Sequence, residues 1–395
     1  MTPCRHWRVR SRLDACRPHQ LLVMRSGKPE STRVSMNPGN PHRQRGVLAR
    51  YAEFLPLTAA TPALSLAEGD TPLLETPRLA SWVGVDDLRL KYEGANPTGS
   101  FKDRGMVLAV AKAMEAGSTT VICASTGNTS ASAAAYAARA GIDAVVLLPA
   151  GKVARGKLAQ AIIAGATVIT LDGNFDQALS VARELARDYR VALVNSVNPH
   201  RIAGQTTAAF EVCDALGDAP EVVALPVGNG GNITAYYEGF RIYRDADRST
   251  RMPVFIGAQA AGAAPLVNGA PVANPETVAT AIRIGNPASW TSAVNAVQAS
   301  GGEFSAISDD AILESYHTVA ELEGIFCEPA SAAGIAALRI AVRNGHVAPG
   351  VRAVCVLTGT GLKDPDRAVP ESFAPAILPA DASAIATQLH LTRQS

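Results

Sequence analysis

The sequence predicts an α/β protein with two domains, in which mostly parallel, twisted sheets are flanked by helices. Short β-branched runs alternate with longer alanine-rich runs from about residue 86 onward, and such alternation produces parallel sheets covered on both faces. The ends of the expected strands are rich in Gly, Ser, Thr and Asn, and ligands bind at the carboxyl ends of strands in such sheets. The length of 395 residues exceeds one average domain, which favours two lobes.

The expected elements alternate along the chain. A strand at 87–93 leads through a turn into a helix at 106–116. Strands and helices then alternate at 119–124, 129–140, 143–149, 153–164, 167–172, 175–189, 191–196, 203–216, 221–228 and 232–243. A strand at 254–260 is followed by a looser stretch, by helices at 309–323 and 330–343, and by a last strand at 353–359.

Composition excludes several classes of function. The net charge of +1 gives no support for binding to nucleic acid or to an anionic membrane, and no apolar run approaches the ~18 residues of a membrane helix. The six cysteines form no CxxC pair, and those in the body of the chain lie in apolar strands or helices, which predicts buried free thiols in a reducing cytosol. No His, Cys and carboxylate cluster has metal-ligand spacing.

The stretch "NPTGSFKDRG", residues 96–105, places Lys102 in the first turn of a helix. Ser100 followed by Asp103 resembles a capping box. The free N–H groups of a helix start disfavour an ammonium group, so a lysine here is expected to have a lowered pKa, which suits amine chemistry.

Two further stretches suggest anion binding at helix starts. "ASTGNTSAS", 124–132, follows a strand and offers Ser125, Thr126 and Asn128, although an ordinary helix cap would also account for it. "GNGGN", 228–232, allows close backbone approach and a phosphate nest, or simply a tight turn. It is not the dinucleotide fingerprint, because Ile233 stands where that motif needs glycine.

Two more strand ends carry polar side chains. "NSVNPHR", 195–201, brings Asn195, Ser196 and Arg201 within seven residues, which suits a phosphate or carboxylate, although a single arginine is more often solvated. "LTGTGLKD", 357–364, places Thr358 just past the last strand. A lysine at a helix start together with two phosphate-type loops suggests an aldehyde cofactor held through its phosphate, and pyridoxal phosphate fits.

In order and spacing, the lysine, STGNTSAS, GNGGN and LTGTGLKD motifs resemble the pyridoxal-phosphate enzymes of the tryptophan-synthase-like fold, or fold type II. Within that group they resemble the threonine synthases of the bacterial and plant-like type, and "TAIRIGNPASW", 280–290, reinforces the likeness, which runs from about residue 46 to 370. It implies a large cofactor-binding domain at 37–94 and 191–395 with a smaller inserted α/β domain at 95–190. The basic segment 1–36 is expected to be a disordered extension or the product of a start codon placed too early.

The resemblance also implies residue roles. Lys102 would be the catalytic residue and would carry the cofactor as a Schiff base, with Gly99 and Gly105 letting the backbone approach the ring. Asn128 would bind the cofactor's 3′-oxygen and Thr358 would face its pyridine nitrogen. The implied binding residues are Gly228, Asn229, Gly230, Gly231 and Asn232 for the cofactor phosphate, Ser125 and Thr126 for the substrate carboxylate, and Asn195, Ser196 and Arg201 for the substrate phosphate.

The implied reaction converts O-phospho-L-homoserine and water to L-threonine and phosphate by β,γ-elimination and replacement, in a cytoplasmic homodimer. A threonine/serine dehydratase of the same fold is the alternative, although its glycine loop is usually closer to GGGGL. A non-catalytic cofactor-binding paralogue would be expected to have lost Lys102 or the Thr358 region, and both are present.

Overall fold

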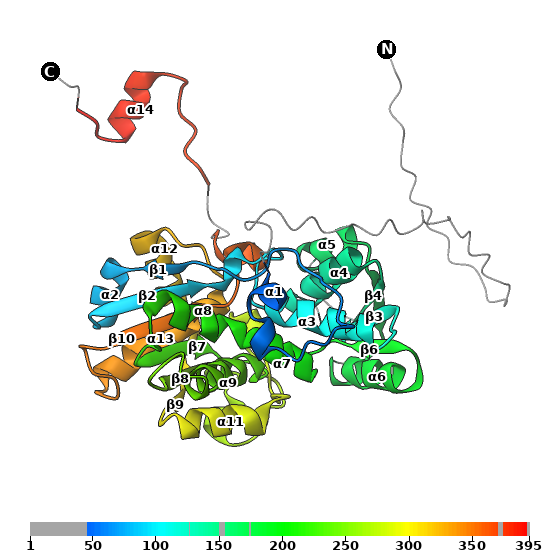
Figure 1. Cartoon of the computed structure of the whole chain (residues 1–395). Coiled ribbons are helices and arrows are strands. Elements are labelled where there is room, and N and C mark those ends of the chain that lie inside the picture. Colours follow the sequence, from blue (N-terminus) through cyan, green and yellow to red (C-terminus); the bar gives the residue numbers. More distant parts are fainter. Residues whose placement is uncertain (1–45, 126, 150–154, 174, 370–373, 393–395) are drawn as a thin grey trace, which may run out of the picture. The chain divides into compact units, whose positions relative to one another are not determined.

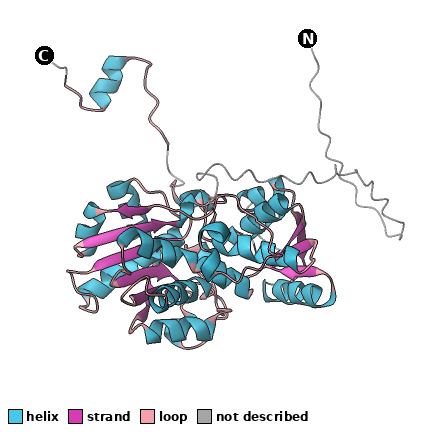
Figure 2. Ribbon diagram, in the orientation of Figure 1, coloured by secondary structure: helices cyan, strands magenta, loops and turns pink. Residues whose placement is uncertain are grey.

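The structure is a computed structural model that describes residues 46–125, 127–149, 155–173, 175–369 and 374–392. Its strands form two sheets (Figures 1 and 2). The six-stranded sheet has the order β1 (Leu73–Glu75), β2 (Asp87–Tyr92), β10 (Arg352–Leu357), β7 (Val222–Pro226), β8 (Val254–Ala260) and β9 (Glu303–Ile307). The four-stranded sheet has the order β5 (Thr167–Leu171), β4 (Asp143–Pro149), β3 (Thr120–Ala124) and β6 (Val191–Leu193). All neighbouring strands are parallel except the β1–β2 pair, which confirms the predicted fold class.

Helices cover both faces of the larger sheet. Strand β7 is buried along its whole length. Val223 and Leu225 belong to the apolar cluster that includes α9 (Gly231–Asp245), whereas Val222 and Ala224 belong to the cluster that includes α13 (Pro329–Arg343). Because successive side chains of a strand point to opposite faces, this alternation explains why the strand is apolar throughout.

The smaller sheet is built in the same way. Val121 and Cys123 of β3 lie in the cluster that includes α4 (Asn128–Ala140), and Ile122 and Ala124 lie in the cluster that includes α6 (Phe175–Asp188). The small side chains of α4 allow the helix to lie close to the sheet, and α5 (Arg155–Ile163) packs beside it.

The remaining elements of the described residues are all helices. They are α1 (Val47–Arg50), η2 (Ala52–Phe54), α2 (Pro77–Val83), η3 (Glu93–Ala95), α3 (Lys102–Glu115), α7 (Pro199–Gln205), α8 (Thr207–Leu216), α10 (Pro265–Asn268), η4 (Thr280–Ile282), α11 (Trp290–Ala299), α12 (Asp309–Glu323), η5 (Gly361–Lys363), η6 (Pro365–Arg367) and α14 (Ala382–Gln388). Within the described residues, none of these helices is both long and apolar enough to cross a membrane.

One predicted helix was wrong in outline. The expected helix at 203–216 is two helices, α7 and α8, which meet at Thr206. The hydroxyl of Thr206 donates to the carbonyl of Ala203 at 2.6 Å, and such local bonds compete with the regular helix. The stretch predicted to be looser after residue 260 contains α11 and β9. These were missed because β9 is short and mostly half-buried, so its residues show little strand periodicity.

The proposed domain division remains a prediction. Residues from His42 to Ser395 form one compact unit, and the predicted extension 1–36 lies outside the described residues. If each sheet is the core of a domain, the inserted segment must continue beyond residue 190, because β6 pairs with β3 in the four-stranded sheet.

Candidate functional site

The loop before Lys102 is paired with the segment that follows β10. The amide of Phe101 donates to the carbonyl of Thr358 at 3.0 Å, and the amide of Thr360 donates to the carbonyl of Gly99 at 3.0 Å. Ser100 and Gly359 form an antiparallel bridge between these bonds. Two motifs that lie about 250 residues apart in the sequence are therefore adjacent, at the carboxyl ends of two neighbouring strands.

Lys102 is the first residue of α3, and its side chain is partly exposed. Its Nζ lies 4.2 Å from the centroid of the Phe101 ring. Desolvation by the surrounding protein and, to a smaller extent, the charge of Arg201 lower the pKa of Lys102 to about 7, whereas Glu328 opposes the shift. The lowered pKa predicted from the helix start is confirmed, but its main cause is burial.

The predicted capping box is wrong. The N-cap residue of α3 is Phe101, and the buried hydroxyl of Ser100 has no hydrogen-bond partner among the described residues. The carboxylate of Asp103 instead accepts bonds from the Thr98 amide at 2.7 Å, from the Thr98 hydroxyl at 2.6 Å and from the Ser132 hydroxyl at 2.6 Å. Asp103 thus fixes the turn before the helix and ties it to α4.

Glycines 99 and 105 allow close contacts within the protein. A Cβ at Gly105 would lie 2.4 Å from the carbonyl oxygen of Arg201, and a Cβ at Gly204 would lie 2.3 Å from the carbonyl oxygen of Arg104. Gly105 and Gly204 therefore allow α3 and α7 to cross at backbone contact. Gly99 has a φ of +84°, and a Cβ there would lie 2.8 Å from the Thr360 side chain, so it serves the pairing of the two loops. The expected approach of these glycines to a cofactor ring stays a prediction.

Arg201 lies on α7 and is fully buried. Its Nη1 donates to the carbonyl of Val194 at 2.9 Å, but Nε and Nη2 have no hydrogen-bond partner within the part of the chain that the structure describes. Desolvation lowers the pKa of Arg201 to about 10, which leaves it charged at neutral pH. A buried guanidinium with unused donors is costly unless an anion binds it.

The other predicted substrate-binding residues differ from one another in burial and in hydrogen bonding. Both polar atoms of the buried Asn195 amide bond the backbone of Ala124, at 3.0 and 2.9 Å, so this side chain joins the ends of β6 and β3. Ser125 is half-buried, and its hydroxyl accepts the amide of Gly127 at 3.2 Å. Ser196 is half-buried near the glycine loop, and Thr126 lies outside the described residues.

The glycine loop 228–232 follows β7 and opens α9. Gly230 is the N-cap, and its φ of +81° lies in the left-handed region that favours glycine. Because a glycine has no side chain, the N-cap residue cannot cover the first N–H groups of the helix. The buried Nδ2 of Asn232 finds no hydrogen-bond partner among the described atoms, and a Cβ at Gly231 would lie 3.9 Å from the carbonyl of Ser196.

The segment 280–290 closes against this loop. The amide of Ser289 donates to the carbonyl of Asn229 at 2.9 Å, and the amide of Ala288 donates to its Oδ1 at 3.3 Å. A Cβ at Gly228 would lie 3.3 Å from the carbonyl of Ala281. The segment 280–290 is therefore adjacent to the glycine loop 228–232 and supports the backbone of that loop.

Two charged residues at the site were missed in the sequence. Glu328 is buried and bonds both Asn128 and Thr358. Lys363, in η5, bonds the side chain of Gln160 on α5, and burial lowers the pKa of Lys363. The available signal for Glu328 was an acidic residue directly before Pro329, at the start of an otherwise apolar, alanine-rich helix.

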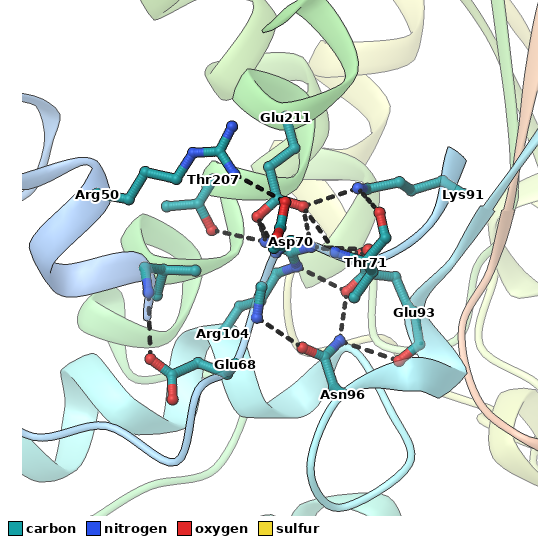
Figure 3. A network of polar contacts seen from close by, with 12 residues as sticks. Arg50, Glu68, Asp70, Thr71, Lys91, Glu93, Asn96, Arg104, Thr207 and Glu211 are labelled. Atoms are coloured by element: carbon teal, nitrogen blue, oxygen red, sulfur yellow. Dashed lines mark hydrogen bonds and ion pairs between the residues drawn. The ribbon is translucent and has the colours of Figure 1, made fainter. Parts of the chain in front are cut away.

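A buried ionic network anchors the first turns of α3 (Figure 3). Nε of Arg104 donates to Glu93 at 2.7 Å, and Nη2 donates to Glu211 at 2.6 Å. Lys91 bonds the same Glu211 oxygen at 2.7 Å. Two cations balance two anions, and the helix that begins with Lys102 is thereby tied to β2, η3 and α8.

Comparison with known proteins gives a consistent result. The family described as pyridoxal-phosphate dependent enzyme matches residues 64–359. The chain is 57% identical to the threonine synthase of Mycobacterium leprae over 347 residues, covering 88% of this chain and 96% of that protein. It is 55% identical to the threonine synthase of Halalkalibacterium halodurans over 341 residues, covering 86% and 96%. The solved structure of maize serine racemase shares the fold, with a TM-score of 0.66 at 18% identity, covering 87% of this chain and 94% of that one.

Proposed function

The chain belongs to the pyridoxal-phosphate-dependent enzymes and, within them, to the threonine synthases, and we propose that the residues around Lys102 carry out the reaction of this family. That reaction converts O-phospho-L-homoserine and water to L-threonine and phosphate, the last step of threonine biosynthesis. One observation carries the assignment of residues. The charge of a buried Arg201 with unused donors acts on the Lys102 amine, whose pKa lies at about 7.

The residues present fit the cofactor. Covalent attachment of an aldehyde needs a neutral amine, which Lys102 supplies near neutral pH. A phosphate needs a helix start with accessible N–H groups, which residues 228–232 supply, and the unpartnered Nδ2 of Asn232 is a further donor. Asn128 and Thr358 would hold the ring through its 3′-oxygen and its nitrogen. When bound, pyridoxal phosphate supplies an electron sink that makes protons on the neighbouring substrate carbons acidic.

Each remaining residue then has a task. Lys102 takes and returns protons at Cα and Cβ of the substrate, which a group with a pKa near the working pH does efficiently. The buried Arg201 holds the substrate phosphate with Nε and Nη2 and keeps it in place as a leaving group. Ser125 and Thr126 would bind the α-carboxylate. Ser196 would assist at the phosphate, whereas Asn195 contributes chiefly by fixing the strand ends, since its amide already bonds Ala124.

We further propose a cytoplasmic homodimer. The resemblance to this fold supports the dimer. The cysteines that the structure describes, Cys123, Cys213, Cys327 and Cys355, are free and buried, which supports a reducing compartment. Size-exclusion chromatography with light scattering tests the dimer, and a monomer across the concentration range would contradict it.

The decisive experiment measures phosphate release from O-phosphohomoserine alongside threonine formation, with deamination of L-threonine as the counter-assay. Equal amounts of phosphate and threonine, with little deamination, are expected. Borohydride reduction followed by peptide mass spectrometry should place the cofactor on Lys102, and Lys102→Ala should abolish turnover while the protein still folds. Deamination without phosphate release would favour a dehydratase instead.

A further inference from the structure

Glu328 joins two side chains that are far apart in the sequence. It stands at the N-cap position of α13 and is buried. The hydroxyl of Thr358 donates to its Oε1 at 2.7 Å, and the amide Nδ2 of Asn128 donates to its Oε2 at 3.0 Å. One carboxyl group therefore fixes a residue that follows β10 and a residue that opens α4.

The backbone around Glu328 holds the carboxyl group in place. Its amide donates to the carbonyl of Gly359 at 3.0 Å, and its carbonyl accepts the amide of Ser331 at 2.9 Å. A Cβ at Gly359 would lie 2.8 Å from Cδ of Glu328, so only a glycine leaves room for the carboxyl group. The hydroxyl of Ser331 lies 3.0 Å from that of Thr358 and accepts the amide of Gly359 at 3.3 Å.

An ordinary structural role does not account for this arrangement. A carboxylate at an N-cap position usually accepts the helix amides, but the Glu328 side chain makes no capping bond. Both of its side-chain hydrogen-bond partners among the described residues are neutral, and the positive groups that act on it, Lys102 and Lys363, do so through charge alone. Cys327 is the adjacent titratable group. Burial raises the pKa of Glu328, although the hydrogen bonds from Thr358 and Asn128 oppose this shift.

We propose that Glu328 is a positioning residue, which would orient the Asn128 amide toward the 3′-oxygen and the Thr358 hydroxyl toward the nitrogen of the bound cofactor ring. The inference rests on the roles proposed above for Asn128 and Thr358. Asn128 uses one of its two amide hydrogens on Glu328 and keeps the other for the ring 3′-oxygen.

The carboxyl group also sets the direction of the Thr358 hydroxyl. This hydroxyl has a single hydrogen. An ionised Glu328 takes that hydrogen, and Thr358 then presents only lone pairs to the ring nitrogen. A protonated Glu328 donates to Thr358 and frees its hydrogen for the ring nitrogen. Without the carboxyl group, the Thr358 hydroxyl keeps Ser331 as its side-chain partner among the described residues, and the direction of its hydrogen is no longer set.

The test uses the cofactor as the probe. Pyridoxal phosphate is titrated into the cofactor-free wild type, Glu328→Gln, Glu328→Ala and a control, Glu68→Gln. Glu68 is also buried and bonds the Val47 amide and the Tyr136 hydroxyl, so it matches the loss of a buried carboxylate away from the site. The dissociation constant and the absorption band of the bound cofactor are followed between about pH 6 and pH 9.

Wild type and Glu68→Gln should give the same dissociation constant and the same band. Glu328→Ala should bind about tenfold more weakly with a shifted band. Glu328→Gln, which keeps the shape but cannot exchange a proton, should bind nearly normally with a band that no longer changes with pH in the wild-type manner. Wild-type bands and pH response in both Glu328 variants would overturn the proposal. Failure of the wild type to bind the cofactor at Lys102 would instead overturn the proposed function, and this inference with it.

Discussion

Gly105 on α3 lies directly against the carbonyl oxygen of Arg201 on α7, close enough that a Cβ at residue 105 would lie 2.4 Å from that oxygen. The helix that begins with Lys102 and the helix that carries the buried Arg201 are thus held at backbone contact. Because both atoms in this contact belong to the backbone, no side-chain movement can relieve a larger residue there.

We therefore expect Gly105→Ala to separate the two helices and to lower the free energy of unfolding by about 1–3 kcal/mol. Urea denaturation followed by circular dichroism measures this change. Gly350→Ala is the matched control, because its nearest neighbour is Asp86 Oδ2 at 3.9 Å. Equal stability of the two variants would show that the crossing of α3 and α7 tolerates a methyl group.

The amine of Lys102 should react as a neutral base at ordinary pH. Since burial and the charge of Arg201 lower its pKa to about 7, the neutral fraction rises as the pH passes through that value. Acylation of Lys102 in the cofactor-free protein, followed by peptide mass spectrometry, should show a midpoint there. In urea the midpoint should return to about 10.4.

Removal of the Arg201 charge tests the direction of the Lys102 pKa shift a second time. Arg201→Met abolishes a cation that disfavours the ammonium form of Lys102, so the midpoint should move to higher pH. A midpoint that stays the same in this variant would mean that Arg201 is too far from the amine to act on it.

Arg201 should support function but lower the free energy of unfolding of the protein. Its unpartnered Nε and Nη2 are buried, and replacing an unsatisfied buried charge with an apolar side chain of similar size commonly stabilises a protein. We expect Arg201→Met to raise the free energy of unfolding of the cofactor-free protein by about 1–3 kcal/mol. Thermal and urea denaturation measure it, and a strong loss of stability would mean that the contacts of the guanidinium, such as its bond to the Val194 carbonyl, stabilise the fold by more than its burial costs.

The same variant should lose kcat/KM for O-phosphohomoserine on the order of 100-fold, since two charge-assisted bonds to a phosphate are removed. Deamination of unphosphorylated serine, measured as a side reaction, serves as the control and should fall much less. Equal losses with both substrates would contradict the assignment of Arg201 to the substrate phosphate.

The sequence contains local signals for the candidate site residues, but it gives little information about which residues from distant parts of the chain contact one another. Polar residues at the ends of strands locate Lys102, the glycine loop and Thr358, because parallel strands end at a common edge. The local signal for Glu328 is only an acidic residue before a proline, because its partners Asn128 and Thr358 come from other parts of the chain. Likewise, the sequence shows that Arg201 follows a strand. It does not show that Nε and Nη2 lack a hydrogen-bond partner among the described residues, because this depends on the packing of α3 against α7.

The ionic network around Arg104 should be important for the placement of Lys102, because both lie in the first turn of α3 (Figure 3). Burial raises the pKa of Glu211, but Arg104 and Lys91 outweigh this effect and lower the pKa. The Glu211 carboxylate is therefore charged at neutral pH. Arg104→Met leaves Glu93 and Glu211 with Lys91 as the remaining cation of the network. We expect the free energy of unfolding to fall by about 3–5 kcal/mol.

Arg50→Met is the control for loss of arginine ion pairs at the exposed edge of the same network (Figure 3), because Arg50 bonds Asp70 and Asp214 and the exposed fractions of the three side chains are 41%, 76% and 37%. Such a pair contributes about 1 kcal/mol or less. Arg104→Met should also weaken cofactor binding, since α3 would no longer be held to η3 and α8, whereas Arg50→Met should leave the dissociation constant unchanged. If both variants lose the same small amount of stability, the network does not anchor the helix, and the position of Lys102 must depend on the other contacts of α3, which include its crossing with α7 and the bonds of Asp103.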